Sequence, residues 1–299
     1  MDRRTFLKNS ALASGAAAST LLCGTRASWA SSLEWPIGLQ LYSVRDSLPK
    51  DFDGTLHQLA AMGYRECEGA GFFGHSAADV KKSMSQAGLH CVSAHYSLQL
   101  LQSPDEILSY GRDLGLEYIV CSSPMPRDPA KAKGHGWAAA VESMSADDWK
   151  WIADQLNTVG KRVQAAGMKF GYHNHYAEFH QHDGFLPYDV LLESTDPKLV
   201  DMEMDCGWVV IGGQKPEDYL TRYPDRYVML HVKEFKLDGW KPGTPPVSTE
   251  LGRGSIDYKS IFAAAKKARV KHIFVEQEAF PDLPEMEAMK ANADWLRAV

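Results

Sequence analysis

Short apolar runs alternate with amphipathic helical stretches along the chain from residue 31 onward. The runs are rich in β-branched and aromatic residues, so the alternation is typical of strands that are separated by helices and that form a parallel sheet. Candidate strands lie at residues 37–42, 64–68, 90–97, 117–122, 169–175, 199–205, 227–233 and 272–277. Eight strand–helix pairs predict a (β/α)8 TIM barrel.

The residues between these runs support the same fold. Gly63, Gly88, Gly115 and Gly167 each stand just before an apolar or aromatic residue, where a helix ends in a left-handed turn. The connections 124–148 and 234–257 are much longer than the others, and both follow strand ends on the face where barrel enzymes build their sites. We expect them to act as lids. A doubly wound sheet is the alternative fold, but no glycine-rich fingerprint follows the first strand.

The first thirty residues differ from the rest. Arg3 and Arg4 open a twin-arginine signature, a small-residue apolar stretch follows at 11–22, and residues 28–30 offer a small-x-small cleavage site. The apolar stretch is shorter than the roughly 20 residues of a membrane span. We therefore expect residues 1–30 to be a twin-arginine signal peptide and 31–299 to be one catalytic barrel, exported to the periplasm or secreted.

Composition excludes several classes of protein. The formal net charge is -6 and no long basic run is present, which argues against a nucleic-acid partner. Hydrophobic residues make up 44% of the chain, enough for a full core, and after signal removal no membrane span is expected. Of the five cysteines, Cys67, Cys91, Cys121 and Cys206 lie in strand-like runs and fit no zinc-binding spacing, so we expect them to be small buried side chains.

Polar residues two apart mark the ends of four consecutive predicted strands. The pairs are His173 and His175, Glu203 and Asp205, His231 and Lys233, and Glu276 and Glu278. Residues i and i+2 share a strand face, so each pair can point into the barrel mouth. A single such residue is more often solvated or paired than functional. Eight ionisable side chains together would be costly to desolvate without a cation, which makes a metal the simplest explanation.

The chain resembles the sugar phosphate isomerase/epimerase family of xylose isomerase-like barrels over nearly its whole length after residue 30. The resemblance rests on short motifs in a fixed order: GLQLYSVR at 38–45, EGAGFFG at 68–74, SAH at 93–95, YHNH at 172–175, DCGW at 205–208, HVK at 231–233, GRGSID at 252–257 and VEQ at 275–277. It implies one divalent ion, bound by His173, Asp205, His231 and Glu276. Many epimerases of this family carry a glutamate where this chain has His173, and the choice between His173 and His175 as ligand stays open.

Two imidazoles and two carboxylates favour Mn, Co, Zn, Ni or Fe over Mg. Among the other polar residues, Glu276, Glu278, His175 and Lys233 are expected to be catalytic; Lys233 would neutralise a developing enolate oxygen or pair with Glu203. We expect Glu68, His95, Tyr42, Trp208 and Glu178 to contact the substrate, Glu68 through sugar hydroxyls and the aromatic residues through an apolar wall.

These features predict a metal-dependent enzyme that removes a proton next to the carbonyl of a sugar and stabilises the enediolate. Reprotonation would give an isomerase or epimerase, loss of water a dehydratase, and loss of a glycosidic group a lyase. The missing glutamate at position 173 and the export signal favour elimination from a 3-keto-glycoside, a substrate to which the resemblance extends. Rival interpretations are an endonuclease of the same barrel and a periplasmic sugar-binding protein. The oligomeric state stays open.

Overall fold

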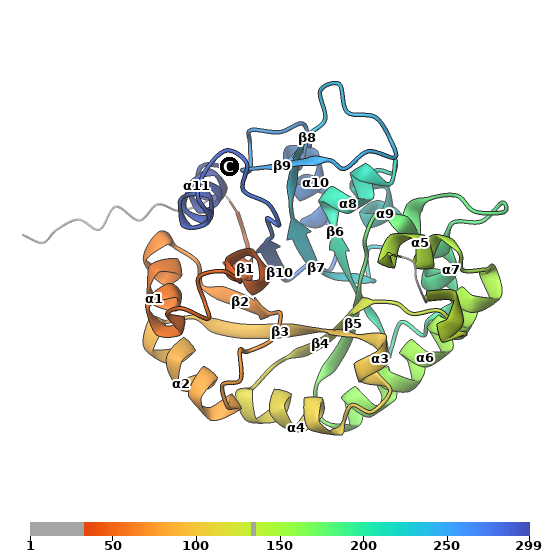
Figure 1. Ribbon diagram of the computed structural model, residues 1–299, viewed down its shortest axis with the longest axis horizontal. Coiled ribbons are helices and arrows are strands. Elements are labelled where there is room, and N and C mark those ends of the chain that lie inside the picture. The colour runs from red at the N-terminus through yellow and green to blue at the C-terminus, as the bar shows by residue number, and fades with distance from the viewer. Residues whose placement is uncertain (1–32, 133–135) are drawn as a thin grey trace, which may run out of the picture. The chain divides into compact units, whose positions relative to one another are not determined.

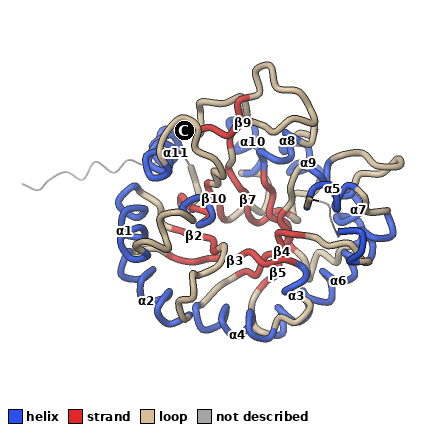
Figure 2. Tube along the Cα trace, in the orientation of Figure 1, coloured by secondary structure: helices blue, strands red, loops and turns tan. Residues whose placement is uncertain are grey.

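The computed structural model describes residues 33–132 and 136–299, and within them the predicted barrel is confirmed. Eight parallel strands close in the order β1-β10-β7-β6-β5-β4-β3-β2, with helices around them (Figures 1 and 2). The barrel strands are β1 (Ile37–Gln40), β2 (Glu66–Gly69), β3 (His90–Ser97), β4 (Tyr118–Ser123), β5 (Lys169–His173), β6 (Asp201–Asp205), β7 (Tyr227–Val232) and β10 (His272–Val275). The predicted signal peptide lies outside the described residues.

The α-helices are α1 (Phe52–Met62), α2 (Ala77–Ala87), α3 (Leu98–Leu101), α4 (Asp105–Leu114), α5 (Trp137–Glu142), α6 (Ala146–Ala165), α7 (Pro187–Ser194), α8 (Cys206–Ile211), α9 (Pro216–Arg222), α10 (Tyr258–Ala265) and α11 (Glu285–Ala298). Short 3-10 helices are η1 (Leu41–Val44), η2 (Pro129–Ala132) and η3 (Ala177–Phe179). Gly63, Gly88 and Gly115 end α1, α2 and α4 with positive φ, as predicted. None of the helices in the described residues is long and apolar enough to span a membrane.

The two long connections contain secondary structure of their own. The first folds into η2 and α5 before Ser145 caps α6 through the backbone N–H of Asp148. The second contains a hairpin of β8 (Glu234–Lys236) and β9 (Val247–Thr249), which the sequence did not predict. The Glu234 carboxylate accepts hydrogen bonds from the backbone N–H groups of Phe235 and Ile256, and so closes the base of this connection.

An apolar layer fills the middle of the barrel. Val120, Met229 and Phe274, from three different strands, are fully buried in one cluster. Gly38 makes room for it, because a Cβ there would lie 2.5 Å from the Phe274 ring. Phe274 has the His231 ring on one side at 6.1 Å and the His272 ring on the other at 6.4 Å. The barrel interior is therefore divided into two polar ends by an apolar plug.

The remaining core lies between the barrel and its helices. Cys67, Cys91, Cys121 and Cys206 are buried with free thiols, which confirms that they serve as small core side chains.

Candidate active site

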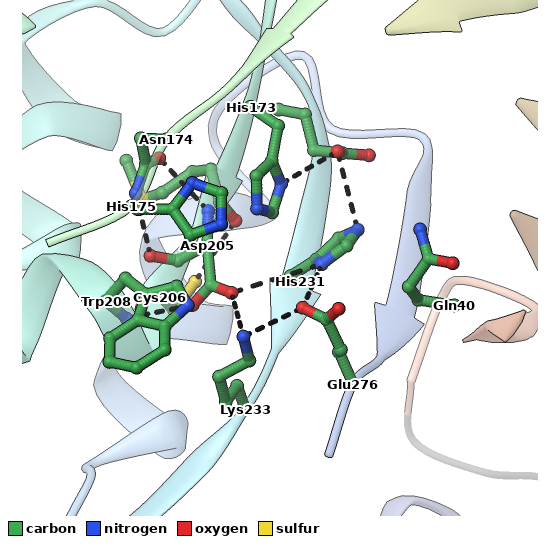
Figure 3. Close-up of polar contacts among 12 residues, drawn as sticks. Gln40, His173, Asn174, His175, Asp205, Cys206, Trp208, His231, Lys233 and Glu276 are labelled. Atoms are coloured by element: carbon green, nitrogen blue, oxygen red, sulfur yellow. Dashed lines mark hydrogen bonds and ion pairs between the residues drawn. The ribbon is translucent and has the colours of Figure 1, made fainter. Parts of the chain in front are cut away.

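The predicted ligand residues converge at the carboxyl ends of the strands. His173 and Asp205 end β5 and β6, His231 lies one residue before the end of β7, and Glu276 follows β10. Each of the four offers a ligand atom, and these atoms all lie within 4.8 Å of one another. His231 Nδ1 lies 3.0 Å from Glu276 Oε2 and 4.0 Å from Asp205 Oδ2 (Figure 3). Two imidazoles and two carboxylates fit a divalent transition metal or zinc, so these residues form a candidate metal site.

The neighbours of Asp205 orient its carboxylate. Asp205 is the N-cap of α8, where its Oδ1 accepts a hydrogen bond from Trp208 N at 2.8 Å. Asn174 holds the same strand end, because its side chain accepts from Asp205 N and donates to Asp205 O. The short sequence from Asp205 to Trp208 thus fixes the carboxylate by helix capping.

Lys233 lies under the carboxylate ligands. Its Nζ is 3.0 Å from Asp205 Oδ2 and 2.8 Å from Glu276 Oε2 (Figure 3). The same ammonium also contacts Glu278. From the sequence, Glu203 was one possible partner of Lys233. In the structure the partners are instead Asp205, Glu276 and Glu278. Burial alone would lower the pKa of Lys233, but the three carboxylates outweigh burial and raise this pKa well above its ordinary value. The ammonium is therefore a fixed positive charge.

A second polar layer lies deeper in the barrel, beneath the ligands. His95 Nε2 is 2.9 Å from Glu68 Oε2 and 2.7 Å from Glu203 Oε2. Glu68 Oε2 is also 2.6 Å from His231 Nε2, and Glu203 Oε2 is 3.0 Å from His173 Nδ1. His95, His173, Glu203 and His231 also offer ligand atoms within 4.8 Å of one another. The two buried glutamates therefore contact both histidines of the candidate metal site.

Opposite charges control ionisation in this layer. Burial would raise the pKa of Glu68, but His95 and His231 outweigh it and lower this pKa below its ordinary value. Burial would likewise lower the pKa of His95, which Glu68 and Glu203 raise to about 9. Burial and the charge on His231 lower the pKa of His173 well below its usual value. This lowered pKa favours the neutral imidazole of His173, the form that binds a metal.

An open cavity of about 590 Å³ lies above the candidate metal site. Two residues of the candidate metal site, His173 and Glu276, line this cavity, and so do His95, His175 and Glu278. The lining residues are Gln40, Tyr42, Ala70, Gly71, His95, Tyr96, Ser97, Leu100, Ser122, Ser123, His173, His175, Glu276 and Glu278. Among the described residues, the two long connections that we expected to be lids supply none of this lining.

The sequence profile of the xylose isomerase-like TIM barrel family matches residues 56–299. The chain belongs to this family. The inosose dehydratase of Geobacillus kaustophilus (strain HTA426) is 26% identical over 234 residues, which are 71% of this chain and 74% of that protein. A sugar phosphate isomerase/epimerase from Parabacteroides distasonis ATCC 8503 is 27% identical, with a TM-score of 0.72 over 87% of this chain and 97% of that one. The 3-keto-D-glucoside 4-epimerase of E. coli shares the fold at 17% identity, with a TM-score of 0.65 over 89% and 100% of the chains.

Within this xylose isomerase-like barrel, the predicted substrate-binding residues have different surroundings. Tyr42 and His95 line the cavity, and Tyr42 is 43% exposed. Glu68 is fully buried below it, with both oxygens hydrogen-bonded. Trp208 packs its ring 4.7 Å from Lys233 Nζ. Glu178 is fully buried, where it accepts hydrogen bonds from Tyr172 OH and His175 N.

The sequence did not single out three residues that support the site. Glu203 was predicted to point into the barrel mouth and was considered as a partner of Lys233 but was given no role in the site, and Gln40 and Ser93 appeared only within motifs. Gln40 Nε2 donates to Glu68 Oε2 at 2.8 Å, and Ser93 Oγ donates to Glu68 Oε1 at 2.7 Å. The alternation that places Glu66 and Glu68 on one strand face could have indicated that Glu68 lies inside the barrel.

Proposed function

We propose that the protein is a divalent-metal-dependent enzyme that cleaves a 3-keto-glycoside by removing the proton next to the ketone and eliminating the glycosidic group. The observation that carries this proposal is the set of His173, Asp205, His231 and Glu276, of which His173 and Glu276 line a cavity that His95, His175 and Glu278 also line. A divalent ion held by these side chains would polarise the ketone of the substrate.

The protein groups divide the remaining work. His175 and Glu278 both line the cavity, so one can take the α proton and the other can protonate the departing oxygen. Lys233 holds Asp205 and Glu276 in place through its ammonium group. A positive charge next to these two residues would also favour negative charge that develops on a substrate bound there.

The proposed reaction balances without a further reagent. The base removes the proton from C2, and the electron pair of the C2–H bond passes to the ketone oxygen at C3. When the pair returns, a C1–C2 double bond forms, the C1–O bond breaks, and the glycosidic oxygen leaves with a proton from the acid. Water can then add to the unsaturated ketone, so that the net result is hydrolysis.

Three observations favour elimination from a glycoside. The inosose dehydratase relative is named for an elimination, the loss of water. The cavity of about 590 Å³ is in the range of pockets for drug-sized ligands, so it leaves room beside a single sugar ring. Tyr42, Tyr96 and Leu100 line one part of it, and they offer an apolar surface to an aglycone.

An inosose-type dehydratase or a sugar epimerase is the second candidate, favoured by the names of the relatives. A non-catalytic sugar-binding protein is a further alternative, which would bind sugar without turnover. We also propose export by the twin-arginine route. Changing both Arg3 and Arg4 to Lys should then keep the protein in the cytoplasm, and an unchanged periplasmic yield would refute this route.

The test compares a 3-keto-glycoside with the same glycoside carrying a C3 hydroxyl. Only the ketone should be cleaved, because the α proton of an unoxidised sugar is far too weak an acid. Deuterium at C2 should slow the reaction when proton removal limits the rate. Equal cleavage of both glycosides would reject proton abstraction. Turnover of an inosose, but not of any keto-glycoside, would favour the dehydratase.

A further inference from the structure

Both histidines of the candidate metal site contact a buried glutamate through one ring nitrogen. The two nitrogens of His231 have different neighbours: Nε2 lies 2.6 Å from Glu68 Oε2, while Nδ1 lies 3.0 Å from Glu276 Oε2 and 4.0 Å from Asp205 Oδ2. His173 Nδ1 lies 3.0 Å from Glu203 Oε2. If each carboxylate accepts a proton from the nitrogen it contacts, then Nδ1 of His231 and Nε2 of His173 keep free lone pairs.

Glu68 is held too firmly to serve as a mobile group. It is fully buried, Gln40 Nε2 donates to its Oε2, and Ser93 Oγ donates to its Oε1. These donors come from β1 and β3, the strands on either side of β2. The carboxylate thus has a fixed position between two strands, from which it can orient His231.

His95 joins the two carboxylates. Its Nε2 lies 2.9 Å from Glu68 Oε2 and 2.7 Å from Glu203 Oε2. The His95 ring is also stacked on the His231 ring, with centroids 5.3 Å apart and an interplanar angle of 5°. The His95 ring therefore holds both glutamates and covers one face of the His231 ring.

We propose that Glu68 and Glu203 are positioning residues, which hold His231 and His173 in the tautomers that direct Nδ1 and Nε2, respectively, toward the metal. The inference rests on the metal site of the proposed function but on no particular reaction. A carboxylate behind a ligand histidine fixes the ring and increases its basicity, and losing such a partner typically weakens metal binding about 10–100-fold. Neither glutamate touches the substrate in this role.

The barrel supplies a matched control. Glu66 lies two residues before Glu68 on β2, and its Oε2 is 2.9 Å from His272 Nδ1 at the opposite end of the barrel. Glu66→Gln removes the charge of a buried glutamate–histidine pair without touching the metal site. Glu68→Gln removes the same charge beneath His231 and keeps the shape of the side chain.

The experiment measures Co²⁺ affinity by calorimetry in the full-length protein, with circular dichroism as the check of folding. Glu68→Gln and Glu203→Gln should each weaken Co²⁺ binding about 10–100-fold. Glu66→Gln should bind Co²⁺ like the wild type. Ser93→Ala, which keeps the Glu68 charge and removes one hydrogen bond, should cost less than about tenfold.

A second measurement reads the tautomers directly. In the Zn²⁺-loaded protein labelled with ¹⁵N-histidine, His231 should carry its proton on Nε2 and His173 on Nδ1. Protons on the opposite nitrogens would overturn the assignment. So would equal losses of Co²⁺ affinity in Glu66→Gln and Glu68→Gln, which would indicate a general structural role. A wild-type protein that binds neither ion would overturn the metal site itself, and with it the proposed function.

Discussion

The two ends of the barrel interior contain the same pair of residue types, and they differ in what surrounds each pair. At the amino-terminal end, Glu66 meets His272 at 2.9 Å. At the carboxyl end, Glu68 meets His231 at 2.6 Å, and His95 and Gln40 also contact this carboxylate. A glutamate–histidine contact alone therefore makes no metal site, and the carboxyl end becomes a candidate metal site because Asp205 and Glu276 also lie close to His231, at 4.0 and 3.0 Å. The comparison shows that a metal site in this barrel needs several ligand residues close together, and that a single glutamate–histidine pair is not enough.

The largest effect should come from removing the His231 side chain, with removal of the His272 side chain as the comparison. His231→Ala should lose the divalent ion and at least about 10³-fold in kcat/KM, because a bound metal supplies several kcal/mol of transition-state stabilisation. Asp205→Ala should behave in the same way. His272→Ala should retain the metal, and elemental analysis beside turnover separates the cases. Full metal content in His231→Ala would break the distinction between the two ends.

The sequence predicted the convergence because strand periodicity and barrel topology are local and regular. It placed the carboxyl ends of four strands one or two residues too late, at Tyr42, His175, Lys233 and Gln277. The chain continues in the same direction past the last residue that pairs with a neighbouring strand, so the sequence pattern does not mark the end of pairing. β1, for example, stops at Gln40, whose side chain accepts a hydrogen bond from Tyr42 N and starts η1. Lys233, Glu276 and Glu278 follow the ends of their strands, and they nevertheless meet at the barrel mouth.

Other contacts could not be predicted from the sequence, because they join residues far apart in the chain. Glu68 and His231 are 163 positions apart, and their contact depends on the stagger of strands around the barrel. The sequence also did not indicate that Glu178, five residues after His173, is fully buried with its carboxylate hydrogen-bonded to Tyr172 OH. Sequence proximity does not show the side of the strand on which a residue in the following turn will pack.

The apolar plug keeps the two polar ends apart, and removing its largest ring should have the next largest effect. Phe274→Ala should lower the free energy of unfolding by about 3–5 kcal/mol, because it leaves a cavity between His231 and His272. Urea denaturation measures this loss. A change below about 1 kcal/mol would mean that the two polar layers can close on each other.

Glu178 extends the comparison to a buried carboxylate whose two hydrogen-bond donors, His175 N and Tyr172 OH, are uncharged. Burial raises the pKa of Glu178 to about 7, although His175 N and Tyr172 OH donate hydrogen bonds to it. Since the folded state holds this proton more tightly than the unfolded chain, stability should fall as pH rises from about 4.5 to about 7. Glu178→Gln should remove that loss, and so gain up to roughly 3 kcal/mol at pH 8 and nothing at pH 4. Urea titrations at both pH values test the sign, and a gain at pH 4 alone would contradict it.

The smallest effect concerns the two glycines that face the plug. A Cβ on Gly38 would lie 2.5 Å from both Ile273 O and the Phe274 ring, so Gly38→Ala must displace a neighbouring strand. Overpacking of this kind costs about 1–3 kcal/mol in unfolding free energy. A Cβ on Gly171 would lie no closer than 3.4 Å to a neighbour, the flexible end of Met229, and Gly171→Ala should cost less.

The double variant Gly38→Ala with Phe274→Leu separates the two contacts of Gly38. The smaller leucine relieves the clash with the ring, while the clash with the Ile273 carbonyl remains, so the two substitutions should cost less together than the sum of their separate costs. Strict additivity would show that the backbone of β10, and not the Phe274 ring, sets the need for glycine at position 38. In that case the Phe274 ring would fill the barrel interior without determining the residue at position 38, and the packing of the strands would keep the two polar ends apart.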